Sequence, residues 1–199
     1  MKNLKTVFAI VTALLLLNSN SFAQKAQTSS GNSVEEGTII IDGFYGFPYF
    51  NGSALRALFS NTVGNVRNTN HLGAKVEYMV TDAIGLGVEF TYANATVSYR
   101  DSLYRTYTAG ISKLRVLGKM NYHFATDENM DPYLTFGAGI KQTTFYDNST
   151  NGVKWTGFLF PVAIRVGVGM RYFFTDVVGV NAEVGLGGPL MQAGVSFRF

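Results

Sequence analysis

Residues 158–173, "FLFPVAIRVGVGMRYF", decide the fold of this chain. Every second residue from Phe158 to Tyr172 is apolar, and the residues between them include Arg165, Arg171 and two glycines. This two-residue period is typical of a β-strand, because successive side chains of a strand point to opposite faces. A face of eight apolar residues without one polar member is longer than the sheet of a water-soluble protein needs. The stretch therefore predicts a strand with one face adapted to an apolar environment.

The same alternation covers most of the chain. Turn signals divide residues 38–199 into eight stretches; seven of them alternate, and the first, 38–47, is the least regular. An even number of short alternating strands predicts an all-β, antiparallel up-and-down barrel of eight strands. The connections between the strands are short turns at 81–83, 125–132 and 174–176, and longer segments rich in Asn, Ser, Thr and Gly at 48–70, 98–104 and 147–154.

The polar faces of the strands carry charges, glycines and amides. We expect their charged residues to form one network inside the barrel, and the glycines to make room for the long Arg and Lys side chains. The predicted lumen network consists of Asp42, Lys75, Glu77, Glu89, Lys113, Arg115, Lys119, Lys141, Arg165, Arg171, Glu183 and Arg198.

An apolar outer face around a polar interior is the pattern of a transmembrane barrel. A soluble lipocalin-like barrel has the inverse arrangement, and the alternation alone fits both. Three further features favour the membrane version: an export signal, charges that share one face with GxG pairs, and a C-terminal strand that ends on an aromatic residue. In hydrocarbon only a closed barrel satisfies every backbone amide, so an open sheet is excluded there.

The N-terminus supplies the export signal. Lys2 and Lys5 precede the apolar run 7–17, which is too short to span a bilayer as a helix. We therefore predict a signal peptide over 1–23, a disordered periplasmic leader over 24–36, and a barrel domain over 37–199. Removing Lys2 and Lys5 from the 16 basic residues leaves 14 against 13 acidic ones, so the charge of the mature chain gives no reason to expect nucleic acid as a partner.

Four motifs carry a resemblance to a known family. "SFAQ" (21–24), "DPYLTFGAGI" (131–140), the turn "FTD" (174–176) and the ending "GVSFRF" (194–199) are similar to those of small eight-stranded outer-membrane barrels, particularly the forms common in Gram-negative Bacteroidetes. None of these motifs is catalytic, so the resemblance concerns architecture.

The resemblance also implies a location and partners. The terminal residues Val195, Phe197 and Phe199 would close the barrel against the first strand and be recognised by the outer-membrane assembly machinery. The expected surroundings are outer-membrane lipids and lipopolysaccharide of a Gram-negative bacterium. We expect a monomer with the short turns and both termini in the periplasm.

The interior suggests several functions. The expectation we favour is a salt-bridged plug inside a structural or adhesive protein, because buried charges persist only when paired. The alternatives are a narrow anion-preferring pore and a conduit for a small ligand. No metal-binding or phosphate-binding motif occurs, and we expect no cofactor and no catalytic site. His71, at the rim beside the first long loop, is the one candidate for lipid-modifying chemistry, the least favoured alternative; His123 lies beside a short turn, on the wrong side for that chemistry.

Overall fold

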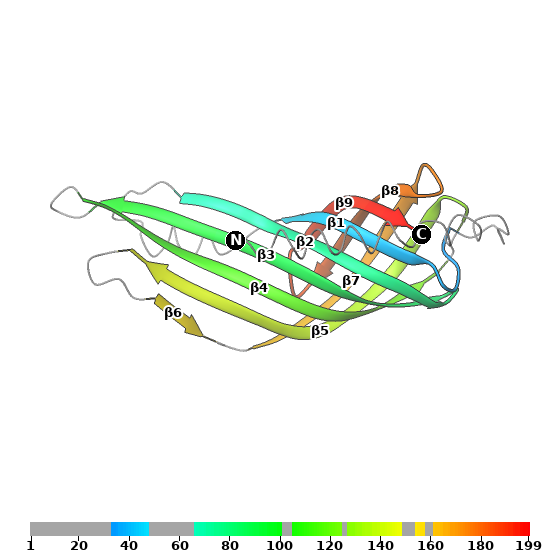
Figure 1. The fold of residues 1–199 in the computed structure, drawn as a ribbon, viewed down its shortest axis with the longest axis horizontal. Coiled ribbons are helices and arrows are strands. Elements are labelled where there is room, and N and C mark those ends of the chain that lie inside the picture. Colours follow the sequence, from blue (N-terminus) through cyan, green and yellow to red (C-terminus); the bar gives the residue numbers. More distant parts are fainter. Residues whose placement is uncertain (1–32, 48–65, 101–104, 125–126, 149–153, 158–160) are drawn as a thin grey trace, which may run out of the picture.

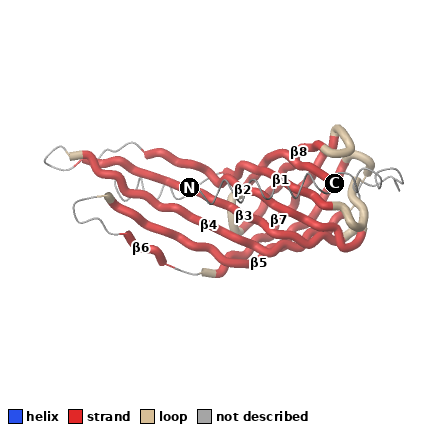
Figure 2. Tube along the Cα trace, viewed as in Figure 1, coloured by secondary structure: helices blue, strands red, loops and turns tan. Residues whose placement is uncertain are grey.

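The computed structural model describes residues 33–47, 66–100, 105–124, 127–148, 154–157 and 161–199, without the side chains of 66–70, 99–100 and 154–157. Every regular element in this part of the chain is a strand (Figure 2). The predicted signal peptide and most of the leader lie outside the described residues. None of the described residues forms a helix long and apolar enough to cross a membrane.

Nine strands form one antiparallel sheet that closes on itself (Figure 1). Their bounds are β1 Ile39–Phe47, β2 Val66–Thr81, β3 Ile84–Arg100, β4 Thr106–His123, β5 Met130–Asp147, β6 Lys154–Gly157, β7 Val162–Phe173, β8 Val178–Leu186 and β9 Met191–Arg198.

The nine strands make eight passes of the chain. β6 and β7 pair with successive parts of β5, so they are two pieces of a single pass. Each pass pairs with the next in sequence, and β1 pairs with β9 to close the ring. At this seam Ile39 and Phe199 exchange two backbone hydrogen bonds of 2.9 Å. The predicted closed, eight-stranded antiparallel barrel is confirmed.

The burial of side chains shows which face of the strands points outward. On β7, Val162 and Ile164 are 63% and 61% exposed, whereas Arg165 and Arg171 are fully buried. The same inversion holds on β8, where Glu183 is buried and Val184 is exposed. Apolar residues therefore cover the outside of the barrel and charged residues fill it, which is the arrangement of a transmembrane barrel and the opposite of a soluble one.

The strands are unequal in length, and the molecule has two distinct ends. We call the end with Phe199 and the turns between β2 and β3, β4 and β5, and β7 and β8 the turn end, and the opposite end the loop end. Towards the loop end β1 stops at Phe47 and β7 begins at Val162, while β2 to β5 run further as an open curved sheet (Figure 1, left). The predicted connection 98–104 is correspondingly shorter, because β3 continues to Arg100.

This open sheet explains an irregularity of the sequence. Thr106, Thr108 and Ser112 interrupt the apolar face of β4. β4 pairs with β3 through this whole stretch, and with β5 from Ala109 onward, without a register shift, so there is no bulge. The polar residues lie beyond the level at which β7 stops pairing with β5, at Ile140. They belong to the open extension rather than to the closed wall.

Residues 33–36, assigned to the disordered leader from the sequence, pack against the turn end. Val34 is 1% exposed and packs with Ile40 and Met79. The hydroxyl of Ser33 donates a hydrogen bond of 2.9 Å to the carbonyl of Met130. These residues are ordered parts of the barrel. Ile40 is an apolar residue on the inner face of the first strand, and its contact with Val34 accounts for this irregularity.

Candidate functional site: the charged lumen

The inward-facing charges form two groups, one above the other along the barrel. At the turn end, Arg171 pairs with three carboxylates: Asp42 at 3.0 Å, Glu77 at 2.6 Å and Asp131 at 2.9 Å. The ring nitrogens of His123 lie 2.9 Å from Glu77 and 2.6 Å from Asp131. These five residues, from β1, β2, β4, β5 and β7, are the turn-end cluster.

Neutral polar groups extend the turn-end cluster. The hydroxyl of Ser196 donates to Asp42 at 2.6 Å and accepts from the side-chain amide of Asn181 at 2.9 Å. The guanidinium of Arg171 stacks over the ring of Tyr133, 4.5 Å from its centroid. Since Tyr133 also donates to Glu183 at 3.2 Å, its side chain connects the turn-end cluster with the charges above it.

Two carboxylates organise the charges towards the loop end. Glu183 accepts hydrogen bonds from Lys75 and Arg165, both at 2.6 Å, and from Lys119 at 3.3 Å. Lys119 also pairs with Glu89, at 3.2 Å. This ammonium group therefore joins the two carboxylates.

The second carboxylate, Glu89, has two more donors. The guanidinium of Arg115 donates to it at 2.6 Å, and the hydroxyl of Thr91 at 3.1 Å. We call the ionic group around both carboxylates the loop-end cluster; it consists of Lys75, Glu89, Arg115, Lys119, Arg165 and Glu183.

Both clusters are almost dry. Every side chain in the ten ion pairs of the described residues is at most 9% exposed. Charges taken out of water are stable only when their partners and hydrogen bonds are complete. The interior thus behaves as one cross-linked ionic core in place of an apolar one.

The hairpin between β8 and β9 closes over the loop-end cluster. The carbonyl of Gly187 accepts a hydrogen bond from Arg115, and the carbonyl of Pro189 accepts one of 3.1 Å from Arg165. Gly187 has a φ of +88°, a backbone conformation that residues with a side chain rarely adopt. The hairpin is therefore folded so that two of its carbonyls face the arginines.

Nine of the twelve predicted network residues lie in these two clusters. The other three do not join them: Lys113 and Lys141 are half-buried on the inner face towards the loop end, and Arg198 lies at the turn end. Arg198 donates to the backbone carbonyls of Ser33 and Asp176, and its guanidinium lies 4.4 Å from the ring centroid of Phe173.

Sequence reasoning missed three inward residues: Asp131, Tyr133 and His123 as an ion-pair partner. Asp131 was assigned to a turn, and Tyr133 is expected at the membrane interface if it is classed by its aromatic ring alone. That interpretation of Tyr133 is wrong, because its side chain is fully buried. The alternation of the strand already indicated this, because Asp131 and Tyr133 occupy odd-numbered positions whereas the outward-facing Leu134 occupies an even-numbered one.

Glycines make room for side chains of the network, as the sequence suggested. A Cβ on Gly85 would lie 2.8 Å from the carboxyl carbon of Glu77, and one on Gly169 would lie 2.7 Å from a ring carbon of Tyr133. Residues without a side chain are thus placed opposite long polar ones.

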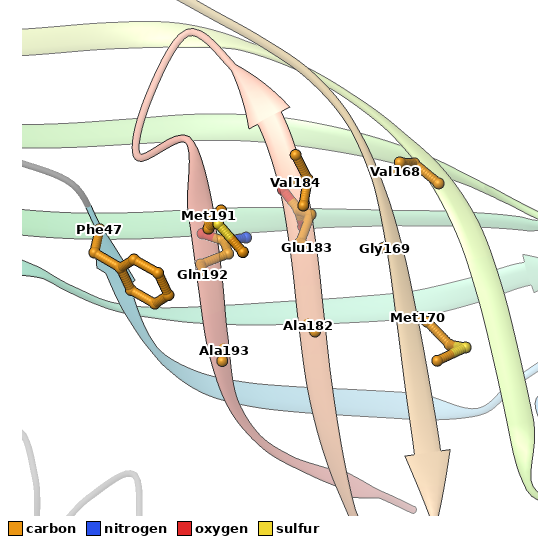
Figure 3. Close-up of a pocket in the computed structure, with 10 residues that line it drawn as sticks. All are labelled: Phe47, Val168, Gly169, Met170, Ala182, Glu183, Val184, Met191, Gln192 and Ala193. Atoms are coloured by element: carbon orange, nitrogen blue, oxygen red, sulfur yellow. The ribbon is translucent and has the colours of Figure 1, made fainter.

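A shallow hollow of about 200 Å³ lies on the outer wall, where small residues face outward (Figure 3). Its floor includes Ala182 and Ala193, and Phe47, Met170 and Met191 stand around it. This apolar hollow faces the lipid and does not enter the lumen. Glu183 and Gln192 also line it, but their side chains are buried.

His71, the one catalytic candidate, lies at the loop end of the closed wall. It is the register partner of Gly46, near the position where β1 ends, and its side chain is half-buried. Among the described residues no group of three or more His, Cys, Asp and Glu side chains is placed to hold a metal ion.

The sequence matches one known protein family. The family described as "Outer membrane protein beta-barrel domain" matches residues 9–189. A search of curated proteins finds no match.

Three solved structures are similar to this chain. The N-terminal β-barrel domain of Pseudomonas aeruginosa OprF is 18% identical, with a TM-score of 0.47 over 83% of this chain and 100% of that one. Ail, the attachment invasion locus protein of Yersinia pestis, in complex with the heparin analogue sucrose octasulfate, is 13% identical, with a TM-score of 0.45 over 82% and 99%. The outer membrane protein OprG of P. aeruginosa is 15% identical, with a TM-score of 0.43 over 83% and 97%.

Proposed function

The chain belongs to the outer membrane protein beta-barrel domain family, and from this premise we propose that it is a structural or adhesive protein of the Gram-negative outer membrane. In this proposal the barrel is an anchor that does not conduct, and the extended sheet at its loop end is the part that meets other molecules. The role is non-enzymatic.

The observation that carries the proposal is the dry, cross-linked lumen. A conducting path would have to pass Glu183 and Arg171, which hold side chains from opposite walls of the barrel. Breaking a buried ion pair by removing one partner costs about 3–5 kcal/mol, so spontaneous opening of several pairs is rare. An eight-stranded barrel also has an interior just wide enough for its own side chains.

The outer face of the extended sheet supports a surface role. Asn94, Ser112 and Thr144 are neighbours in one register row across β3, β4 and β5, on the face that is apolar in the closed wall. Tyr146 donates a hydrogen bond of 3.4 Å to Asn94 on the same face. Neutral polar groups in this position suit contact with lipopolysaccharide sugars or a host surface.

The proposed orientation places the turn end in the periplasm. In barrels of this type the short turns are periplasmic and the longer loops face outward. β9 would be recognised by the outer-membrane assembly machinery through Val195, Phe197 and Phe199, whose side chains are exposed on the lipid side. We further propose a monomer of the form common in Bacteroidetes, surrounded by outer-membrane lipids and lipopolysaccharide.

Planar-bilayer conductance of the refolded chain tests the closed lumen. We expect no discrete current steps for the natural chain. Steps that disappear in Arg115→Gln would overturn the proposal in favour of an anion-preferring pore. A heat-modifiable band on an unboiled gel shows in the same sample that the barrel has folded.

Cysteine labelling tests the orientation, and the absence of natural cysteines makes it clean. A membrane-impermeant maleimide should label Thr108→Cys on intact cells but not Asp127→Cys, which lies at the turn end. Lysed cells should show both variants labelled. The reverse pattern on intact cells would refute the proposed orientation.

A further inference from the structure

Charge is distributed unevenly along the lumen. In the turn-end cluster, three carboxylates face Arg171 and His123. In the loop-end cluster, the carboxylates of Glu89 and Glu183 face four cations. Lys113 and Lys141 add two more cations beside it, since Lys141 is the register partner of Arg115 and Lys113 lies two residues before Arg115 on β4.

The guanidinium groups of Arg115 and Arg165 converge at one point of this region. A Cβ on Gly188 would lie 2.7 Å from Nη2 of Arg115 and 2.7 Å from Nη1 of Arg165. Two like charges held this close repel each other unless negative charge lies between or beside them. Glu89 and Glu183 each neutralise one guanidinium but also serve Lys119.

Both arginines retain unused donors. Within the part of the chain that the structure describes, Nε of Arg115 and Nη2 of Arg165 are buried without a hydrogen-bond partner. Arg165 is 0% exposed and Arg115 8% exposed. Buried N–H groups of charged side chains are nearly always satisfied by protein, ligand or water, so these two donors are available to a bound group.

Among the described residues, several groups next to the two arginines reach solvent at the loop end. Gly187 and Gly188 are exposed, and the side chains of Lys113 and Lys141 are half-buried next to Arg115 on the inner face. A ligand at this end would therefore find ammonium and guanidinium groups on neighbouring positions of β4 and β5.

We propose that Arg115, Arg165, Lys113 and Lys141 form a binding site for a phosphate or sulfate group at the loop end of the lumen. A tetrahedral oxyanion has enough oxygens to accept from two guanidinium groups at once, and guanidinium matches such groups in geometry. The site faces the lumen, away from the lipid, so we assign the ligand to a soluble molecule. This proposal goes beyond the structural role, because a closed anchor needs no ligand.

Isothermal titration of the refolded full chain in detergent micelles with sodium phosphate tests the site, with sodium chloride at equal ionic strength as the baseline. We expect saturable binding that weakens by about tenfold or more in Lys113→Gln/Lys141→Gln, since each lost contact is a charge-assisted hydrogen bond. Arg105→Gln, which removes an exposed cation at the same end, is the control and should bind like the natural chain.

The outcomes separate the site from general electrostatics. No saturable binding, or equal weakening in the control and the double variant, would overturn the proposal. Binding of a short-chain phosphatidic acid but not of inorganic phosphate, with loss in the double variant, would support the site with a lipid headgroup as the ligand. In the natural chain the NMR resonance of Arg115 Nε should shift on phosphate addition; a silent resonance would also count against the site.

Discussion

Replacing Arg171 by methionine is the sharpest test of the ionic core. The substitution keeps an unbranched side chain that can lie on Tyr133 but removes the positive charge. It leaves the carboxylates of Asp42, Glu77 and Asp131 without their shared partner. Folding then has to bury negative charges or take up protons to neutralise them.

The expected loss of stability is about 3–5 kcal/mol, the cost of breaking a buried ion pair by removal of one partner. The loss is not three times larger, because the carboxylates keep other donors. Glu77 and Asp131 still contact His123, and Asp42 still accepts from Ser196. A lost cation–π contact with Tyr133, worth about 0.5–2 kcal/mol, is part of the same change.

The assay is urea unfolding of the chain refolded into lipid vesicles, followed by the shift between folded and unfolded bands on an unboiled gel. Arg105→Met is the matched control, since Arg105 is exposed. A surface substitution of this kind changes stability by about 0.5 kcal/mol or less. Arg171→Lys should fall between the two, because an ammonium group keeps the charge but cannot reproduce the planar fork.

Equal stabilities for Arg171→Met and Arg105→Met would refute the reasoning. Such a result would mean that water enters the lumen and screens the carboxylates, so that the side chains are paired only loosely. The closed-lumen proposal would fail with it, and conductance would become the expected property.

Three further predictions use the same unfolding assay or the yield of folded protein. Gly169→Ala places a methyl group against the ring of Tyr133 and should cost about 1–3 kcal/mol. Gly118→Ala, whose Cβ would lie 3.7 Å from the carbonyl oxygen of Ala138, should be nearly neutral, and equal effects of the two substitutions would contradict the packing. Val34→Asp buries a carboxylate at the turn end and should lower stability by about 2 kcal/mol or more, and an unchanged midpoint would show that residues 33–36 do not pack there. Deleting Phe199 removes two hydrogen bonds of the seam and should reduce the fraction of heat-modifiable protein in the membrane, and normal assembly would exclude a role for the terminal residue.

The face to which each side chain points was predictable, because it is a local property of the strand. A strand sends neighbouring residues to opposite faces, so Arg165 and Arg171 had to share a side once Val166 and Val168 were assigned to the other. The same rule placed Glu183 and Lys119 inside. It failed where a residue was judged by its type, as with Tyr133, whose parity already pointed inward.

The partners of each charge were not predictable. Arg171 reaches Asp42 across 129 positions of sequence, and Lys75 reaches Glu183 across 108. These distances depend on how far each strand is shifted against its neighbours, and a shift of two residues preserves the alternation while changing every contact. The position of Lys113 and Lys141 beside the loop-end cluster depends on the same shifts.

The sequence by itself determined the alternation, the closed eight-pass barrel and the inversion of polar and apolar faces, because a two-residue period and the need to satisfy backbone amides in lipid leave few other solutions. Only the tertiary structure decided which charges pair, that β2 to β5 outgrow the closed wall, and that Arg115 and Arg165 meet under the last hairpin. Those features arise from strand register and from unequal strand ends, which place residues from distant parts of the chain at one level of the lumen.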